Sequence, residues 1–278
     1  MPGPFPSLTL FIGPQSSHGL ALNLVVRDNR PGMVKAGLAA MPTRLASPAL
    51  RSIADPNRTL DERRATFAGF SDEAPAFFAA LNFLGAPHKG FRQAELYPDA
   101  EVQLGLLAEV AGEARFRVVL SLDDLPNLFL ATGSDVLEDR VRATPWEQLY
   151  AVSWAELVEG VLDCLPGAEV LVLTHAGVAL GGATLVARLF GPAAGVLNGR
   201  DLLHAGLNLT GQAVLDRMGA ATPDPAAARE LYRSFADRAD AAVCRERLGM
   251  DRLTRKLMLQ RFDEDMGAIA AMDRVEVI

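Results

Sequence analysis

Three short runs of apolar residues stand out along the chain, at residues 8–12, 117–122 and 169–174. The second and third are rich in valine and leucine, and each follows a stretch of helical periodicity, at residues 99–111 and 153–165. Strands of near-continuous apolar residues separated by helices are typical of a parallel sheet that is covered on both faces. The pattern therefore predicts an α/β fold in which a central parallel sheet is flanked by helices.

Turn and cap residues mark the limits of these elements. The first run ends at Gly13, and the apolar residues 20–26, after a polar turn at residues 15–19, predict a buried helix. Ser153 followed three residues later by Glu156 forms a capping box, which predicts a helix start. The first strand, turn and helix are thus predicted as one β–α unit.

The character of the chain changes after Gly191. A passage rich in glycine and asparagine, residues 191–211, leads into a predicted helix over about 225–248 and a second helix capped by Asp251. The residues expected to face inward on these two helices are Leu231, Phe235, Ala239, Ala242, Leu253, Leu257, Met266 and Ile269. No further strand is needed in this part of the chain.

The composition is that of a globular protein. Hydrophobic residues make up 50% and charged residues 22% of the chain, which excludes a disordered protein. We expect one domain over residues 1–278, with an α/β core in 1–190 and the helices of 191–278 packed on it. The 27 basic and 34 acidic residues give a net charge of −7, which argues against a nucleic-acid-binding protein because phosphates require a concentrated positive surface.

Cysteine usage and hydropathy favour a cytoplasmic location. Cys164 and Cys244 lie far apart and outside any CxxC motif, so neither a disulfide framework nor a zinc knuckle is expected. The first residues have no basic segment followed by a long apolar run, which argues against a signal peptide. No uncharged apolar run approaches the ~20 residues that span a bilayer, so no membrane association is expected.

The first β–α turn is the best candidate for chemistry. Gly13 and Gly19 allow close approach to a helix N-terminus, where backbone N–H groups and the helix dipole favour anions. The turn contains no lysine or arginine, and Ser16 or Ser17 stands where a phosphate loop places its cation. A plain turn with a serine cap explains the same residues and is favoured from them alone.

A nucleophile elbow is an alternative interpretation of the same turn. Ser17 precedes His18 and Gly19, as the serine of G-x-S-x-G would precede its last two residues, but Gln15 occupies the position of the first glycine. The elbow would also come after the first strand, earlier than usual in a hydrolase. We therefore give it the lowest weight.

The histidines and one acidic pair complete the candidates. His18, His88, His175 and His204 show no ligand spacing between them, so no metal is expected. His175 directly follows the third apolar run, where ligand clefts of α/β sheets lie, although a structural role is favoured. Asp123 and Asp124 follow the second run and could act as a general base, or cap the helix that begins near residue 125; we favour the cap.

Several segments, taken in order, resemble the bacterial sulfotransferase-like proteins, a branch of the P-loop-type fold. The segments that carry the resemblance are residues 96–100, 117–122, 149–157, 166–170 and 261–265. The resemblance implies sulfuryl transfer from 3′-phosphoadenosine 5′-phosphosulfate to a hydroxyl, commonly of a carbohydrate. It also implies that the donor lies at the first β–α turn.

The resemblance implies which residues would hold this donor, and the chain departs from the family there. The family's Gly-x-x-Lys-Thr-x-Thr motif aligns with residues 13–19, so that Gly13, Gln15, Ser16, Ser17 and Gly19 would contact the phosphosulfate and Ser16 replaces the lysine. The arginine that grips the 3′-phosphate aligns with Asp123, and the serine that assists it aligns with Ala131, with Thr132 and Ser134 as nearby substitutes. The acidic residue that precedes the position of Asn82 in relatives is absent.

These departures leave three hypotheses. In the first, the protein is an active sulfotransferase in which His18, or less directly His88, supplies the missing cation as a catalytic residue. In the second, the protein is a non-catalytic relative that binds a small molecule, a carbohydrate or a protein partner. In the third, it is an α/β hydrolase with Ser17 as nucleophile. Because donor-binding cations are missing at two positions, the chemistry favours the second.

Overall fold

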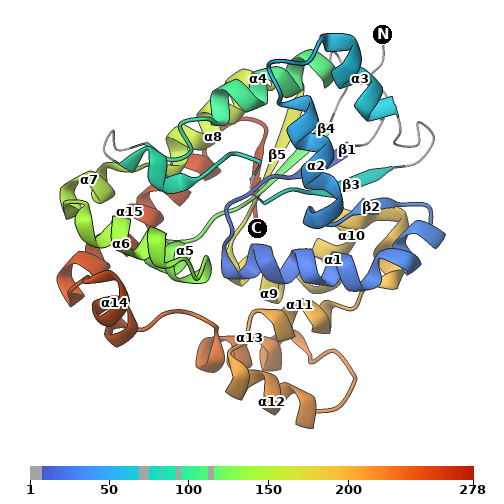
Figure 1. The fold of residues 1–278 in the computed structure, drawn as a ribbon. Helices are drawn as coiled ribbons and strands as arrows, with labels where there is room; N and C mark the ends of the chain where they lie inside the picture. The colour runs from blue at the N-terminus through green and yellow to red at the C-terminus, as the bar shows by residue number, and fades with distance from the viewer. Residues whose placement is uncertain (1–7, 69–74, 82, 92–94, 112–115) are drawn as a thin grey trace.

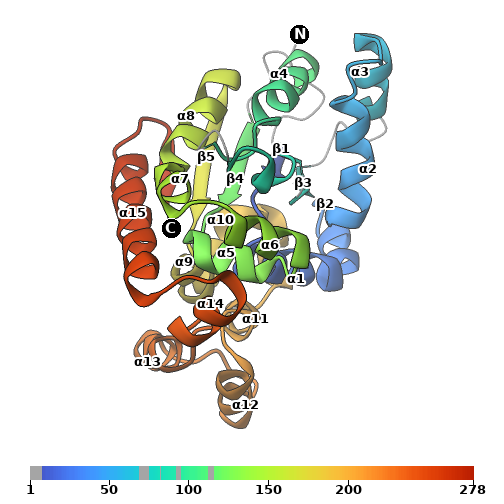
Figure 2. The same ribbon diagram turned by 60° about the vertical axis from the view of Figure 1, so that its left-hand side comes forward.

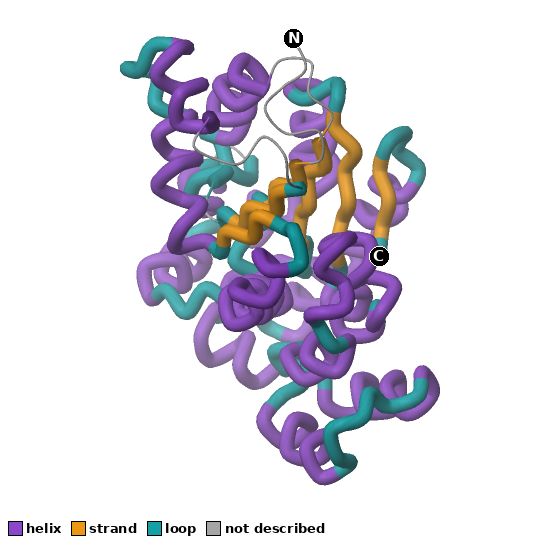
Figure 3. The backbone as a smooth tube through the Cα atoms, turned by 90° about the vertical axis from the view of Figure 1, so that its right-hand side faces the viewer, coloured by secondary structure: helices purple, strands orange, loops and turns teal. Residues whose placement is uncertain are grey.

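The computed structural model describes residues 8–68, 75–81, 83–91, 95–111 and 116–278 and has a parallel sheet as its central layer (Figures 1 and 3). The sheet contains β1 (Leu8–Phe11), β2 (Ala39–Met41), β3 (Ala76–Ala79), β4 (Phe116–Ser121), β5 (Ala168–Leu173) and β6 (Val275–Val277). The strands lie in the order β2-β3-β1-β4-β5-β6, and every neighbouring pair is parallel. The predicted α/β fold is confirmed.

Helices cover both faces of this sheet (Figure 2). In chain order they are α1 (Ser17–Lys35), α2 (Thr43–Ile53), α3 (Leu60–Ala68), η1 (Pro87–Lys89), α4 (Ala100–Ala111), α5 (Leu125–Ala131), α6 (Asp135–Ala143), α7 (Trp146–Ala151), α8 (Trp154–Cys164), α9 (His175–Leu180), α10 (Gly182–Phe190), η3 (Gly191–Val196), α11 (Gly199–Ala205), α12 (Leu209–Arg217), α13 (Pro225–Phe235), α14 (Ala241–Leu248) and α15 (Arg252–Ala270). In the described parts of the chain, no helix has the length and apolar character to cross a bilayer.

Alternation along the strands divides the core between the two faces. In β1, Leu8 and Leu10 contribute to the core under α2, α4, α5 and α8, whereas Phe11 packs with α1 and α10 on the other face. In β4, Val118 and Val119 divide in the same way. Because both faces are buried, both sets of positions are apolar, and this is why the strands appear as continuous apolar runs in the sequence.

The chain connections place a crevice between β1 and β4. Helix α1, which follows β1, packs on one face of the sheet, whereas α5, which follows β4, packs on the other. Connections that leave neighbouring strands toward opposite faces separate at the carboxyl ends of those strands, where ligands of open α/β sheets bind. The topology therefore directs attention to the residues that follow Phe11 and Ser121.

Three predictions about the elements are wrong. Strand β6 lies after residue 191 and extends the sheet beside β5, although no strand was expected there. The predicted helix over 225–248 is two helices, α13 and α14, because the chain leaves the helical path after Phe235 and a new cap at Asp240 starts α14. Leu253 and Ala242, both expected to face inward, are exposed, Leu253 to 65%.

Two segments on which the family resemblance rests are in contact. The carboxylate of Asp265 on α15 is buried and accepts hydrogen bonds from the Ser153 hydroxyl (2.9 Å) and the Trp154 backbone N–H (2.8 Å) at the start of α8. The Trp154 indole N–H in turn donates to the backbone oxygen of Asp123, 3.0 Å away. The predicted cap of α8 by Ser153 is confirmed, and Asp265 links this helix start to the end of β4.

Replacement of Asp265 by alanine tests this link. The change leaves the buried Ser153 hydroxyl and Trp154 N–H without their acceptor, so we expect a loss of about 3 kcal/mol in the free energy of unfolding, measured in urea. The control is Asp263→Ala, an exposed position on the same helix, which we expect to change stability by less than about 0.5 kcal/mol. Equal effects of the two changes would contradict the structural role of Asp265.

Candidate functional site at the ends of β1, β4 and β5

The turn after β1 is packed against the end of β4. A Cβ atom at Gly13 would lie 2.6 Å from the Ser121 backbone nitrogen, and one at Gly19 would lie 2.5 Å from the Ser121 hydroxyl. That hydroxyl donates to the backbone oxygen of Pro14, and the buried Ser16 hydroxyl accepts from the Gly19 N–H at 3.1 Å. Ser16 is therefore the N-cap of α1, as the plain-turn interpretation predicts. The glycines are required by the close approach of β4.

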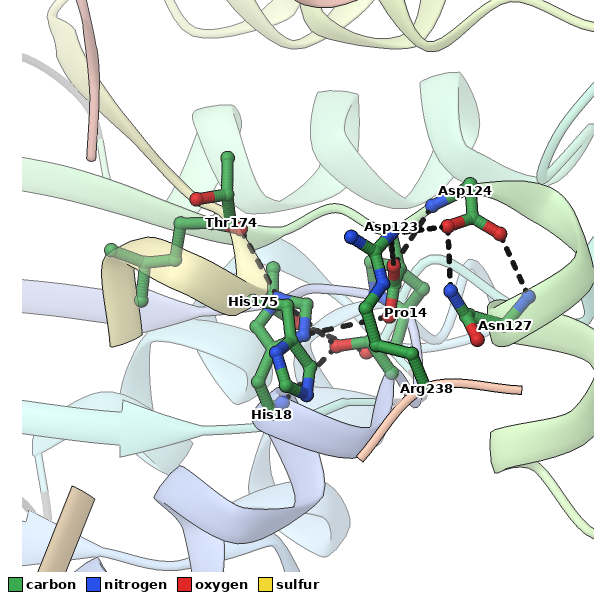
Figure 4. Close-up of polar contacts among 12 residues, drawn as sticks. Pro14, His18, Asp123, Asp124, Asn127, Thr174, His175 and Arg238 are labelled. Atoms are coloured by element: carbon green, nitrogen blue, oxygen red, sulfur yellow. Dashed lines mark hydrogen bonds and ion pairs between the residues drawn. The ribbon is translucent and has the colours of Figure 1, made fainter. Parts of the chain in front are cut away.

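His18 lies at the centre of the site and is fully buried (Figure 4). Its Nε2 atom is 3.2 Å from the backbone oxygen of Leu173, which can only accept, so we assign the ring hydrogen to Nε2. The other ring nitrogen, Nδ1, faces the Oδ2 atom of Asp123 at 3.7 Å. Burial, with a smaller contribution from nearby His175, lowers the pKa of His18 to about 3. The ring is therefore neutral at physiological pH, which disfavours the hypothesis that His18 supplies a cation.

Asp123 is a buried carboxyl at the carboxyl end of β4. Burial and the neighbouring Asp124 raise the pKa of Asp123 to about 8, against the opposing effect of Arg238. A protonated carboxyl therefore faces a neutral imidazole, and the contact between Asp123 and His18 is not an ion pair at neutral pH. Neither group carries the charge that the family's donor requires.

Arg238 is a positive group at this site that the sequence did not predict. It lies in the segment between α13 and α14 and donates to the Asp124 carboxylate at 2.5 Å, while Asp123 Oδ1 is 3.7 Å away (Figure 4). Asp124 also caps α5 by accepting from the Asn127 N–H, which confirms the predicted cap. The Arg238 charge is thus compensated by a carboxylate that lies only 1% exposed. The only signal for this position in the sequence is the Asp240 cap that interrupts the predicted helix.

His175 joins the same cluster from the end of β5. Its Nδ1 atom is 2.7 Å from the hydroxyl of Tyr232 on α13, and its ring centroid is 5.5 Å from that of His18. Burial lowers the pKa of His175 to about 4, so this ring is also neutral. The Nε2 atom of His175, like Nδ1 of His18 and Oδ2 of Asp123, is buried without a hydrogen-bond partner among the described residues. The structure therefore brings His18, Asp123 and His175 together.

The remaining predicted residues lie outside this cluster. The Thr132 hydroxyl donates to Phe129 within α5, and the Ser134 hydroxyl caps α6. His88 belongs to η1, but its side chain is not among the parts that the structure describes, and Asn82 lies outside the described residues altogether. The side chain of neighbouring Lys89 forms an ion pair with Asp99 at 2.7 Å. The hydroxyl groups of Thr132 and Ser134 thus stabilise helix ends.

The residues at this turn do not fit the phosphosulfate donor. Gly13 and Gly19 are packed against Ser121, so their lack of a Cβ atom is explained by the neighbouring strand without a bound anion. At the end of β4, Asp123 occupies the position expected of the arginine, and Arg238 is already held by Asp124. Gln15, partly buried in the turn, adds no charge.

A separate cavity of about 750 Å³ opens beside the cluster, on the side of α1, α11 and α12. Ser17, Ala131, Asp237, Arg200 and His204 are among its lining residues. Ser17 is the first residue of α1, and its Oγ atom is buried without a hydrogen-bond partner among the described residues. Ser17 and Ala131 therefore line the same cavity. The resemblance would place Ser17 at the phosphosulfate end of the donor and Ala131 at its 3′-phosphate end.

No family model, no curated protein and no solved structure matches the chain. Within the described residues, no group of three or more His, Cys, Asp or Glu side chains is arranged to hold a metal ion. The assignment of function therefore depends on the geometry of the site itself.

Replacement of Arg238 by methionine tests its role as a tie between the α13–α14 segment and the sheet. The change leaves the buried Asp124 carboxylate without its cation, and because Arg238 is 40% exposed we expect a loss of about 2 kcal/mol. The control is Arg233→Met, whose exposed side chain pairs only with Glu230 on the same helix and should cost less than about 0.5 kcal/mol. Urea unfolding measures both, and an unchanged stability of the Arg238 variant would contradict the tie.

The buried cluster also predicts how stability depends on pH. Asp123 stays protonated in the folded protein up to about pH 8 but ionises near pH 4 when unfolded, so its contribution falls as the pH rises between these values. His18 and His175 are protonated below about pH 6.5 only in the unfolded chain, so they increase stability as the pH rises to that value. We expect maximal stability near pH 6.5 and a fall of up to about 2 kcal/mol by pH 8.

The Asp123→Asn variant isolates this effect. It removes the carboxyl that titrates, so we expect the fall in stability between pH 6.5 and 8 to disappear, whatever the variant's stability at pH 6.5. The Asp263→Asn variant, at an exposed position, should keep the fall. A fall of equal size in both variants would show that another group titrates.

Proposed function

We propose that this protein is a sulfotransferase-like protein that binds a small molecule and does not transfer a sulfuryl group from 3′-phosphoadenosine 5′-phosphosulfate. The proposal rests on the charge of the side chains at the end of β4, where a buried, neutral Asp123 faces a neutral His18. The chain order β1–turn–α1, the parallel sheet and the crevice beside β4 agree with the resemblance to the family.

Electrostatics is the reason why transfer is not expected. Sulfuryl transfer passes through a highly charged transition state, and an enzyme lowers its energy with fixed positive groups aimed at the donor oxygens. In the described cluster the guanidinium of Arg238 is shared by Asp124 and Asp123. The donor would therefore meet two acidic side chains and two neutral imidazoles, without a free cation among the described residues that form the cluster.

The hydrolase hypothesis lacks a base for Ser17. A nucleophilic serine needs a nitrogen acceptor within hydrogen-bond reach. The His18 Nε2 atom is instead directed at Ser16 (3.4 Å) and at the Leu173 oxygen, its accepting Nδ1 atom faces Asp123 at 3.7 Å, and Ser17 Oγ has no hydrogen-bond partner among the described residues. Ser16 itself is fully buried and caps α1, so a substrate has no access to it.

The proposed location is the cytoplasm. Cys164 and Cys244 are free thiols, and a reducing compartment keeps thiols in this form. The proposed ligand is a small molecule. The family resemblance implies a carbohydrate as one such ligand, and a protein partner is the alternative for a non-catalytic relative.

A thermal shift with adenosine 3′,5′-bisphosphate tests the proposal. A ligand at one hundred times its dissociation constant would stabilise the protein by about 2.7 kcal/mol. We expect no shift at millimolar nucleotide and no sulfuryl transfer from the labelled donor, whereas an active sulfotransferase under the same conditions shows both. A clear shift that Asp123→Asn strengthens would overturn the proposal, because it would place the nucleotide at the end of β4.

A further inference from the structure

The cavity beside α1 has two chemically different walls. The α1 wall is apolar over Leu20, Ala21 and Leu24, with the Ser17 hydroxyl at its first turn and the polar side chains of Asp28 and Asn29 farther along the helix. The opposite wall, formed by α11, α12 and the segment after α13, is polar and contains carboxylates. A volume of about 750 Å³ is in the range of sites that hold small organic ligands.

Only some of the carboxylates on the polar wall are compensated by a cation. Arg200 is held by the backbone oxygens of Leu215 and Gly219 and by the carboxylate of Asp216, which also lies 3.7 Å from His204. These contacts compensate Asp216. Asp28 pairs with Arg27 outside the cavity. Two acidic side chains that line the cavity therefore remain.

Asp201 and Asp237 are these two acidic side chains. Neither forms an ion pair with another described residue, although both line the cavity. Arg238, adjacent to Asp237 in the chain, donates to Asp124 instead. Partial burial, without a compensating cation, raises the pKa of Asp237. A hollow with excess negative charge on one wall and apolar surface on the other attracts a positively charged ligand with an apolar body and disfavours an anion.

We propose that the cavity lined by Ser17, Leu20, Leu24, Asp201 and Asp237 binds an organic amine. The apolar body of the amine lies on the α1 wall, and its ammonium group faces Asp201 and Asp237, with the unpartnered Ser17 hydroxyl as a further acceptor. This inference rests on the proposed function, because it names the class of small molecule.

Three probes of similar shape test the charge preference. 2-Phenylethylamine, 2-phenylethanol and 3-phenylpropanoate share an aromatic body and differ in the charge of the end group. We expect calorimetric titration to show amine binding at least tenfold tighter than that of the alcohol, and no binding of the carboxylate. Tighter binding of the carboxylate, or no binding of any probe, would overturn the inference.

Paired substitutions locate the interaction. Asp201→Asn with Asp237→Asn should weaken amine binding at least tenfold and leave the alcohol within twofold, whereas the control pair Asp263→Asn with Asp273→Asn, both exposed and outside the cavity, should change neither. Leu24→Lys, at a position 44% exposed, adds a positive charge to the other wall and should weaken the amine more than the alcohol. Amine binding that withstands both changes would overturn the site.

The amine experiment and the nucleotide experiment test the two proposals independently of each other. Amine binding that disappears in all tests leaves the absence of nucleotide binding, and hence the proposed loss of transfer, unaffected. A nucleotide-induced shift that Asp201→Asn with Asp237→Asn does not alter would instead overturn the proposed function and leave the amine site in place.

Discussion

The ion pair between Arg238 and Asp124 connects the end of β4, in the central sheet, to the segment between helices α13 and α14. Asp124 belongs to the end of β4 and caps α5, whereas Arg238 comes from the segment that follows α13. Next to it, the Ala239 N–H donates to the Asn127 side chain, and Tyr232 on α13 contacts His175. Helices α11, α12 and α13 share a small core with Ala179 of α9, and these polar contacts join that group of helices to the ends of β4 and β5. The position of α12 and α13 therefore depends on this shared core and on one compensated charge.

Burial explains why the rest of the cluster is neutral. A charge that leaves water for a protein interior is costly unless a partner compensates it, so buried acids and bases shift their pKa values toward the neutral form. Arg238 can compensate one carboxylate, and it lies closer to Asp124 than to Asp123. Asp123, His18 and His175 remain uncharged as a consequence. The same pair that holds the α13–α14 segment thus compensates the arginine that, among the described residues of the cluster, could have bound an anionic donor.

The parts of the fold that the sequence predicted are those with a strong local pattern. Strands β1, β4 and β5 are continuous apolar runs next to turn residues, and the caps at Ser153, Asp124 and Asp251 are local hydrogen bonds. Strands β2 and β6 have only three residues each and show no such run. They form because a neighbouring strand offers its hydrogen bonds, which is information from distant residues.

The residues of the candidate site, like the strands, could be predicted only where the sequence has a local pattern. Asp123 and His175 were identified because each directly follows a predicted strand, and His18 because it lies in the turn after the first one; parallel strands end at one edge of the sheet. Arg238 and Tyr232 come from a segment more than 100 residues after Asp124, and the helical periodicity of residues 225–248 concealed the break that positions Arg238. The charge state of the cluster could not be predicted either, because it depends on which of two carboxylates this arginine reaches.

The contact of Asp265 with Trp154 gives a reason why packing segments keep their resemblance to the family while the site departs from it. Asp265 accepts from the Trp154 backbone, and the Trp154 indole donates to the backbone oxygen of Asp123. These bonds fix the backbone at the end of β4 whatever side chain residue 123 carries. A substitution there changes the chemistry of the crevice and leaves the hydrogen bonds that support it intact. The absence of a free cation from the described cluster, on which our proposal rests, is therefore compatible with this packing, since the scaffold and the chemistry of the site depend on different atoms of residue 123.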